Sequence, residues 1–243
     1  MASPDKARRD AQPAFVLHRY PFRETSLVVE TFTRDHGRVP LIARGARRSK
    51  STLRGVLLSF QPLLLSWTGK TELRSLIRAE WEGAYAPLKG RSLICGFYLN
   101  ELLLKLLPRD DPHERLFAIY QEALAMLGGQ HEQEAILRRF EIGLLRELGY
   151  AVTLDRDAAN DEPIRGDRSY VYIIERGPVP AGRGAGKNGV ELSGRTLLDM
   201  HAGDYAGAAT QQQSKMLMRV LINHYLDDQM LHTRQLLRDL QEL

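Results

Sequence analysis

Residues 43–55, with the sequence ARGARRSKSTLRG, contain five basic side chains and no acidic one. Cations at this density neutralise phosphates and release the counterions around a nucleic acid, so they favour binding with little sequence preference. A solvated surface loop would explain the same composition, and only the neighbouring elements can decide between the two interpretations. The five cations are Arg44, Arg47, Arg48, Lys50 and Arg54.

A second stretch, GRGAGKNG at residues 182–189, has the composition of a phosphate-binding loop but not its pattern. The pattern G-x-x-x-x-G-K-[ST] needs glycine where Ala181 stands, and it needs a hydroxyl for Mg²⁺ where Asn188 stands. We therefore interpret this stretch as a flexible loop.

The remaining reactive side chains form no catalytic or metal-ligating set. The seven histidines show no H-E-x-x-H or comparable spacing. Cys95 lies in an apolar run, which favours a buried structural thiol. Asp110 and Asp111 precede an expected helix, where Asp111 would serve as the N-cap. We expect no enzyme activity, no metal and no cofactor.

Composition and charge narrow the class of partner. The 243 residues are 43% hydrophobic and 26% charged, which is ordinary for a folded soluble protein. Residues 1–80 carry 15 Lys and Arg against 7 Asp and Glu, whereas residues 81–243 carry 19 against 23. This asymmetry predicts an acidic partner for the first part of the chain, either nucleic acid or an anionic membrane surface. No apolar run approaches the roughly 18 residues of a membrane span, and no secretory signal is visible. The single cysteine predicts the cytoplasm.

The pattern of apolar residues predicts an α+β protein. We expect a disordered lead-in over residues 1–13 and a five-stranded OB-fold barrel over residues 14–84, with strands near 14–20, 26–33, 37–44, 62–69 and 72–81. Helical periodicity then predicts an α-helical domain over residues 85–154 and 204–243, in which the first three helices share a core. Between them, residues 155–203 contain one clear strand, SYVYIIE, in a β-hairpin or irregular insertion.

A barrel context strengthens the nucleic-acid interpretation of residues 43–55. OB-fold barrels bind single strands by combining a basic groove with aromatic stacking platforms. Arg38 precedes the basic stretch, and Lys70 and Arg74 follow it in the last strands, so we include all three as expected DNA contacts. The candidate platforms, most of which we expect to be core residues, are Tyr20, Phe22, Phe32, Phe60 and Trp67.

The order and spacing of six blocks resemble the RecO family of bacterial recombination mediators over nearly the full length. The blocks are AFVLHRYPFRETSLVVETFTRDHGRV, ARGARRSKSTLRG, FQPLLLSW, YLNELLLKLLPRDDPHERLFAIYQEAL, LRRFEIGLLRELGY and the terminal MRVLINHYL with TRQLL. The resemblance implies a protein that binds single- and double-stranded DNA and anneals complementary strands. It also implies action with RecR to load RecA onto coated single strands, contact with the acidic tail of the single-stranded-DNA-binding protein, and a nucleoid-associated location. Whether RecF is a third partner stays open.

One departure from the family concerns metal binding. Many members carry a four-cysteine zinc finger after the LGY block, but here Asp157 stands near the place of the first cysteine. The chain therefore resembles a zinc-free branch, in which residues 155–203 must be held together by packing.

The tail of the coat protein would need an apolar pocket with a cation at its rim. Arg138 and Arg139, beside Phe140 on the third helix, have this chemistry. The alternative is a pair on the helix surface that bonds to Glu134 or Glu141.

Two competing functions also remain at this stage: a general OB-type RNA-binding or single-strand-binding module, and a hydrolase whose His/Asp set lies within residues 155–203.

Overall fold

The computed structural model describes residues 8–129, 131–150, 152–182, 189–227 and 229–239. The chain divides into two compact units. The first contains residues 1–130 and 231–243, and the second contains residues 131–230. None of the described helices is long and apolar enough to cross a membrane.

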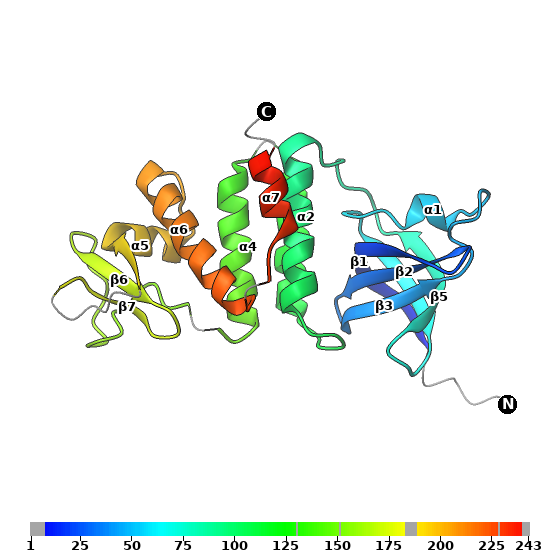
Figure 1. Ribbon diagram of the computed structural model, residues 1–243, viewed down its shortest axis with the longest axis horizontal. Coiled ribbons are helices and arrows are strands. Elements are labelled where there is room, and N and C mark those ends of the chain that lie inside the picture. The colour runs from blue at the N-terminus through cyan, green and yellow to red at the C-terminus, as the bar shows by residue number, and fades with distance from the viewer. Residues whose placement is uncertain (1–7, 130, 151, 183–188, 228, 240–243) are drawn as a thin grey trace. The chain divides into compact units, whose positions relative to one another are not determined.

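The first unit begins with a closed barrel in the strand order β1-β2-β3-β5-β4 (Figure 1). All neighbouring strands are antiparallel except β3 and β5, which pair in parallel through Leu41 with Arg74 and Ile42 with Ser75. The predicted five-stranded OB-fold barrel is thereby confirmed. The strands are β1 (Arg9–Phe22), β2 (Ser26–Thr33), β3 (Gly37–Ala43), β4 (Leu63–Thr68) and β5 (Arg74–Trp81).

Strand β1 begins earlier than the sequence predicts. Arg9 pairs with Trp67 and Gln12 with Leu65, so part of the expected disordered lead-in is ordered by pairing with β4. The apolar alternation of β1 becomes clear only from Ala14 onward, which explains why the boundary was misplaced.

Helices α2 (Gly90–Leu106), α3 (Glu114–Leu127) and α7 (His232–Asp239) complete the first unit. The barrel and the helices meet in a buried aromatic cluster, in which the ring of Phe15 lies 5.5 Å from Phe117 and 5.2 Å from Tyr120. In the same place Asn100 Nδ2 donates to the Leu17 carbonyl at 2.8 Å, and Asn100 Oδ1 accepts from the Tyr120 hydroxyl. One buried amide therefore joins β1, α2 and α3.

The segment before α3 corrects a predicted helix cap. The N-cap is His113, and Asp111 lies outside the helix, where its carboxylate contacts His113 Nε2 at 3.1 Å. Asp111 is displaced because its segment packs on the β2–β3 turn: a Cβ on Gly37 would lie 2.0 Å from the Asp111 carbonyl oxygen. Only glycine fits that turn, which also has a φ of +64°.

The second unit contains a three-stranded sheet of order β7-β6-β8 and three helices. Its core joins apolar side chains of α4 to the sheet and the other helices, with Leu145, Tyr170, Leu197 and Leu221 among its buried members. Helix α4 thus belongs to this unit, whereas α2 and α3, predicted to share its core, belong to the first. The elements are α4 (Gln133–Glu147), β6 (Ser169–Ile173), β7 (Gly177–Pro180), β8 (Val190–Ser193), α5 (Gly194–Ala202) and α6 (Ala208–Tyr225).

The predicted insertion at residues 155–203 contains more regular structure than the one strand expected. Strand β6 forms a hairpin with β7 and pairs with β8 on its other edge. Helix α5 follows, capped by the Ser193 side chain, which accepts from the Thr196 N–H, and closed by Gly203 in the left-handed region. The short strand and helix carry too little periodicity to be predicted from sequence.

We expect Asn100→Leu to lower the free energy of unfolding by about 2–4 kcal/mol, because the Leu17 carbonyl and the Tyr120 hydroxyl would lose a buried partner. Tyr120→Phe keeps the aromatic packing and should cost only about 1–2 kcal/mol. Urea denaturation followed by tryptophan fluorescence measures both. Equal stability of Asn100→Leu and the wild-type protein would contradict the role of this amide.

Candidate nucleic-acid interface

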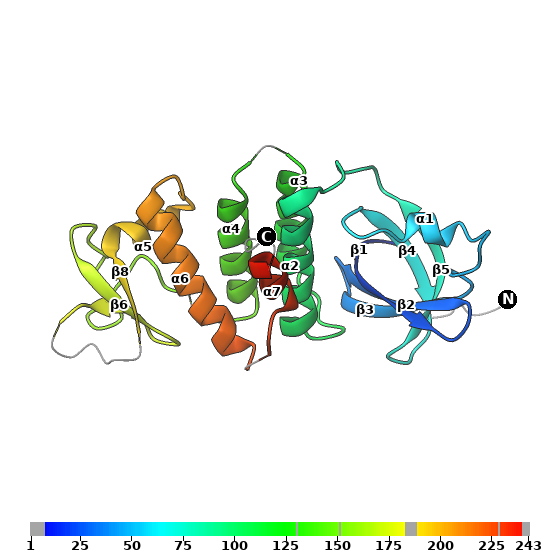
Figure 2. The same ribbon diagram turned by 45° about the horizontal axis from the view of Figure 1, so that its top comes forward.

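The basic loop, defined here as residues 43–55, connects β3 to the short helix α1 (Leu53–Val56). Ala46 is completely buried and anchors the loop in the barrel core. The Arg47 N–H donates to the Thr25 carbonyl at 2.9 Å, and Arg47 Nη1 donates to the Arg23 carbonyl at 3.1 Å. The loop is therefore fixed to the β1–β2 turn, and Figure 2 shows α1 lying beside β4 and β5.

The five cations of the basic loop are all exposed. Among the described residues none of them forms an ion pair, and Arg47 alone uses its guanidinium in a hydrogen bond, to a backbone carbonyl. No acidic residue interrupts the loop. A surface of this kind attracts phosphates and is not neutralised by its own chain.

Sequence reasoning missed two exposed cations, one in β1 and one in the β1–β2 turn. Arg19 lies within β1, where it pairs with Val29, and Arg23 lies in the turn, where its backbone carbonyl accepts from the loop. The Arg23 guanidinium also lies 5.2 Å from the centroid of the Phe22 ring. The distance of Arg23 in sequence from residues 43–55 concealed its proximity to the loop, because only the barrel pairing of β1, β2 and β3 reveals it.

The candidate stacking platforms divide into two groups. Phe32, Phe60 and Trp67 are buried, so three of the five aromatic residues serve the core, as expected for most of them. Tyr20 is 46% exposed, and Phe22 is half-buried at the end of β1. The Tyr20 ring lies 4.3 Å from the His18 ring.

Arg38, one of the predicted DNA contacts, holds the barrel to a helix. Its Nη1 donates to the carbonyl of Leu104 on α2, and burial lowers the pKa of its guanidinium. Its own carbonyl accepts from the Asp110 N–H at 3.0 Å. The partner on α2 lies 66 residues further along the chain, which no local pattern reveals.

Arg74 is engaged within the protein, whereas Lys70 is exposed. Arg74 Nη1 contacts Asp110 Oδ1 at 2.6 Å and its side chain is largely covered, so its charge is matched within the protein. Lys70 is exposed in the β4–β5 turn. Only Lys70 therefore stays available for an external anion.

Arg138 and Arg139 are also engaged within the second unit. Arg138 Nη2 contacts Glu141 Oε1 at 2.5 Å, and Glu141 is completely buried. Arg139 donates through both Nε and Nη2 to the Gly203 carbonyl, at 3.2 and 2.8 Å, which caps the end of α5. Arg138 thus pairs with Glu141 on its own helix, although this pair is buried and not on the helix surface, and Arg139 caps the end of α5.

No cluster that could hold a metal ion occurs among the residues that the structure describes. Cys95 is buried, as predicted. Asp157 is buried as well, and its Oδ1 accepts from the N–H groups of Ala159 and Asn160 at 2.8 Å each. Asp157 therefore closes a backbone turn. The glycine-rich residues 183–188 lie outside the described part of the chain.

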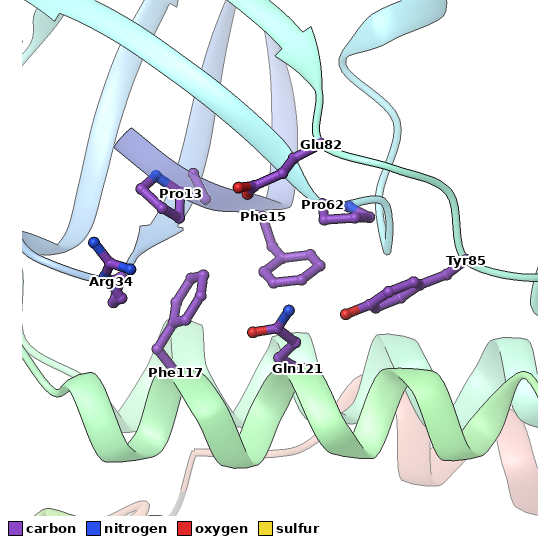
Figure 3. Close-up of a pocket in the computed structure, with 9 residues that line it drawn as sticks. Pro13, Phe15, Arg34, Pro62, Glu82, Tyr85, Phe117 and Gln121 are labelled. Atoms are coloured by element: carbon purple, nitrogen blue, oxygen red, sulfur yellow. The ribbon is translucent and has the colours of Figure 1, made fainter. Parts of the chain in front are cut away.

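A pocket of about 340 Å³ lies between the barrel and α3 (Figure 3). Phe15, Phe117 and Tyr85 line it, and Arg34 and Glu82 give it one charge of each sign. Arg34 is further matched by Asp35 at 2.8 Å. None of the predicted DNA contacts lines this pocket, so it is separate from the basic loop.

Comparison with known proteins covers nearly the whole chain. A family model described as "Recombination protein O N terminal" matches residues 9–85, and one described as "Recombination protein O C terminal" matches residues 88–234. A protein of Nitrosospira multiformis named "DNA repair protein RecO" is 58% identical over 239 residues, which cover 98% of this chain and 99% of that relative. A relative of the same name from Aromatoleum aromaticum is 56% identical, with the same coverage.

The buried pair on α4 generates a prediction. Arg138→Met removes the guanidinium that contacts the buried Glu141 carboxylate at 2.5 Å, and we expect a loss of about 3–5 kcal/mol in the free energy of unfolding. The double variant Arg138→Met/Glu141→Leu should recover most of this loss, because no charge is then left buried. Urea denaturation measures both variants. An Arg138→Met protein of wild-type stability that no longer binds a tail peptide would return Arg138 to a binding site.

Proposed function

Because this chain belongs to the RecO family of DNA repair proteins, we propose that it is a recombination mediator that binds single- and double-stranded DNA and anneals complementary strands. With RecR it would help load RecA onto coated single-stranded DNA. The observation that carries the DNA-binding step is the basic loop, with its five exposed cations fixed against the β1–β2 turn. The proposal includes no bond-making chemistry and no cofactor.

The DNA surface that we propose contains the basic loop at its centre. Its cations would neutralise phosphates of either strand, and Arg23 in the adjoining β1–β2 turn, Arg19 in β1 and Lys70 in the β4–β5 turn would extend the surface. Arg38 and Arg74 are left out because their guanidinium groups bind within the protein. Contacts to the phosphate backbone carry no base information, which suits a protein that must act on any sequence.

Annealing follows from the same charges. Two phosphate chains repel each other, and a cationic surface that contacts both lowers this repulsion without reading bases. The surface would hold the strands while their own base pairing selects the partner.

The protein partners that we propose are those implied by membership of the family. We propose RecR and the acidic C-terminal tail of the single-stranded-DNA-binding protein as partners, and RecF as a third candidate. No residue is assigned to the tail, because Arg138 and Arg139 have structural contacts. The work would take place in the cytoplasm at the nucleoid.

The DNA-binding step predicts a strong dependence on salt. With about five phosphate contacts, the slope of log affinity against log salt should be roughly −4 to −5 for duplex DNA and about −3.5 for single strands. Changing Arg47, Arg48 and Lys50 to glutamate should weaken binding at least about tenfold and bring the duplex slope to about −2. Fluorescence anisotropy of a labelled oligonucleotide at several salt concentrations measures both quantities.

A matched control carries the same change of charge elsewhere. Arg165, Arg168 and Arg176 are exposed in the second unit, and their replacement by glutamate should leave both slopes near the wild-type values. A wild-type slope shallower than about −2, or equal losses in the two triple variants, would contradict a DNA surface at the basic loop.

The mediator step is tested by annealing of complementary oligonucleotides, each first coated with the cognate single-stranded-DNA-binding protein. We expect the wild-type protein to accelerate annealing and the Arg47/Arg48/Lys50 glutamate variant to lose that acceleration. Bare DNA bound without any acceleration would indicate a general OB-fold binding module, and a preference for RNA would favour the same interpretation.

A further inference from the structure

Trp81 ends the last strand of the barrel with an exposed indole ring. It pairs with Leu63 of β4, and its side chain is 53% exposed, whereas the other tryptophan, Trp67, is 2% exposed. Alternation along β5 places Trp81 on the same face as Ala79, which packs against the barrel core. The ring therefore lies at the open end of the barrel.

The indole is held in one orientation by α1. Its Nε1 donates to the Val56 carbonyl at 3.0 Å, and the Leu58 N–H donates to the same carbonyl at 2.8 Å. The single polar atom of the ring is thus satisfied inside the protein. Because this atom is engaged, the remaining ring atoms of Trp81 are apolar, and the neighbouring Leu58 is 39% exposed. A ring held in this way is preorganised to stack with another ring.

The basic loop leads directly to this ring. The loop runs into α1, Arg54 lies two residues before Val56, and the Val56 carbonyl binds the Trp81 indole. The surface thus passes from a row of cations to an exposed aromatic face. Proteins that bind single strands combine these two features, because the cations follow the phosphates while the rings stack on bases.

The two acidic residues beside Trp81, Glu80 and Glu82, do not lie between the basic loop and the indole ring. Glu80 points to the other face of β5 and pairs with Arg78 at 2.6 Å. Glu82 lines the pocket against α3, where Figure 3 shows its carboxylate beside Pro13 and Phe15. A phosphate chain is therefore directed away from that pocket and toward the basic loop.

We propose that Trp81 is a base-stacking platform for single-stranded DNA and that the basic loop directs the phosphate chain across it. The inference rests on the proposed DNA-binding function and deepens it, because stacking needs an unpaired base. Trp81 would add a preference for single strands, whereas the loop cations would bind single and double strands alike.

The test compares three probes of one length: a single-stranded oligonucleotide, an abasic strand with the same phosphates, and a duplex. We expect Trp81→Leu to weaken binding of the single strand roughly tenfold and to leave the abasic strand and the duplex within about twofold. Trp81→Phe, which keeps an aromatic face, should retain most of the affinity. Leu58→Ala, the matched control on the same patch, should have little effect, since it removes apolar surface but no ring.

Tryptophan fluorescence gives a second measurement that needs no variant to fold. Single-stranded DNA should quench the exposed Trp81 and protect it from acrylamide, whereas the abasic strand should do neither. Wild-type DNA binding without quenching, or equal losses on all three probes in Trp81→Leu, would overturn the stacking platform and leave the DNA surface in place. Unchanged DNA affinity in Trp81→Leu and Leu58→Ala with loss of a partner protein would overturn it in favour of a protein interface. If the wild-type protein bound none of the probes, the proposed function itself would fail.

Discussion

The parallel pairing of β3 with β5 is the constraint on which the functional surface depends. It closes the barrel, and it leaves β4 between β5 and β1 in the strand order. The chain that leaves β3 therefore cannot turn back in a tight hairpin to reach β4. Residues 44–62 make this crossing, and they contain both the basic loop and α1. The connection that barrel closure requires is thus the segment that presents the cations and supports the indole of Trp81.

The arginine residues of this chain separate by whether the protein supplies their oxygen partner. Arg38 binds a helix carbonyl, Arg74 an aspartate and Arg139 a carbonyl at the end of a helix. Each of these groups stabilises a junction between elements. The cations of the basic loop are exposed, and the loop is anchored mainly by the buried Ala46 and by Arg47, which binds the β1–β2 turn. Arginine thus joins elements of the fold at some positions and is exposed to a ligand at others.

The sequence predicts the barrel and the exposed basic loop, but it does not predict which individual side chains bind within the protein. Alternating apolar residues and turn formers predict the strands, and an unbroken basic run flanked by strands predicts an exposed loop. The partner of Arg38 is 66 residues away and that of Arg74 is 36 residues away, so no local pattern identifies them. The two tryptophans are equally apolar in sequence, and only their positions in the barrel make Trp67 core and Trp81 surface. Two predicted element boundaries were wrong. Strand β1 begins at Arg9 because its pairing with β4 extends beyond the apolar alternation, and Asp111 is not the helix cap because its segment packs on Gly37.

The burial of Ala46 has a consequence for how this surface can vary. Its Cβ sits in the core, and the adjacent Arg47 N–H binds the β1–β2 turn, so the path of the loop backbone is fixed at two neighbouring points. The side chains of Arg44 before these points and of Arg48, Lys50 and Arg54 after them form no hydrogen bond or ion pair with the described residues, so exchanging arginine for lysine there changes neither packing nor path. Inserting or deleting a residue between Ala43 and Ala46 would instead shift Ala46 out of its site. The loop is therefore tolerant in composition throughout and strict in length only up to its anchors, so charge can be redistributed along a backbone whose starting path is fixed.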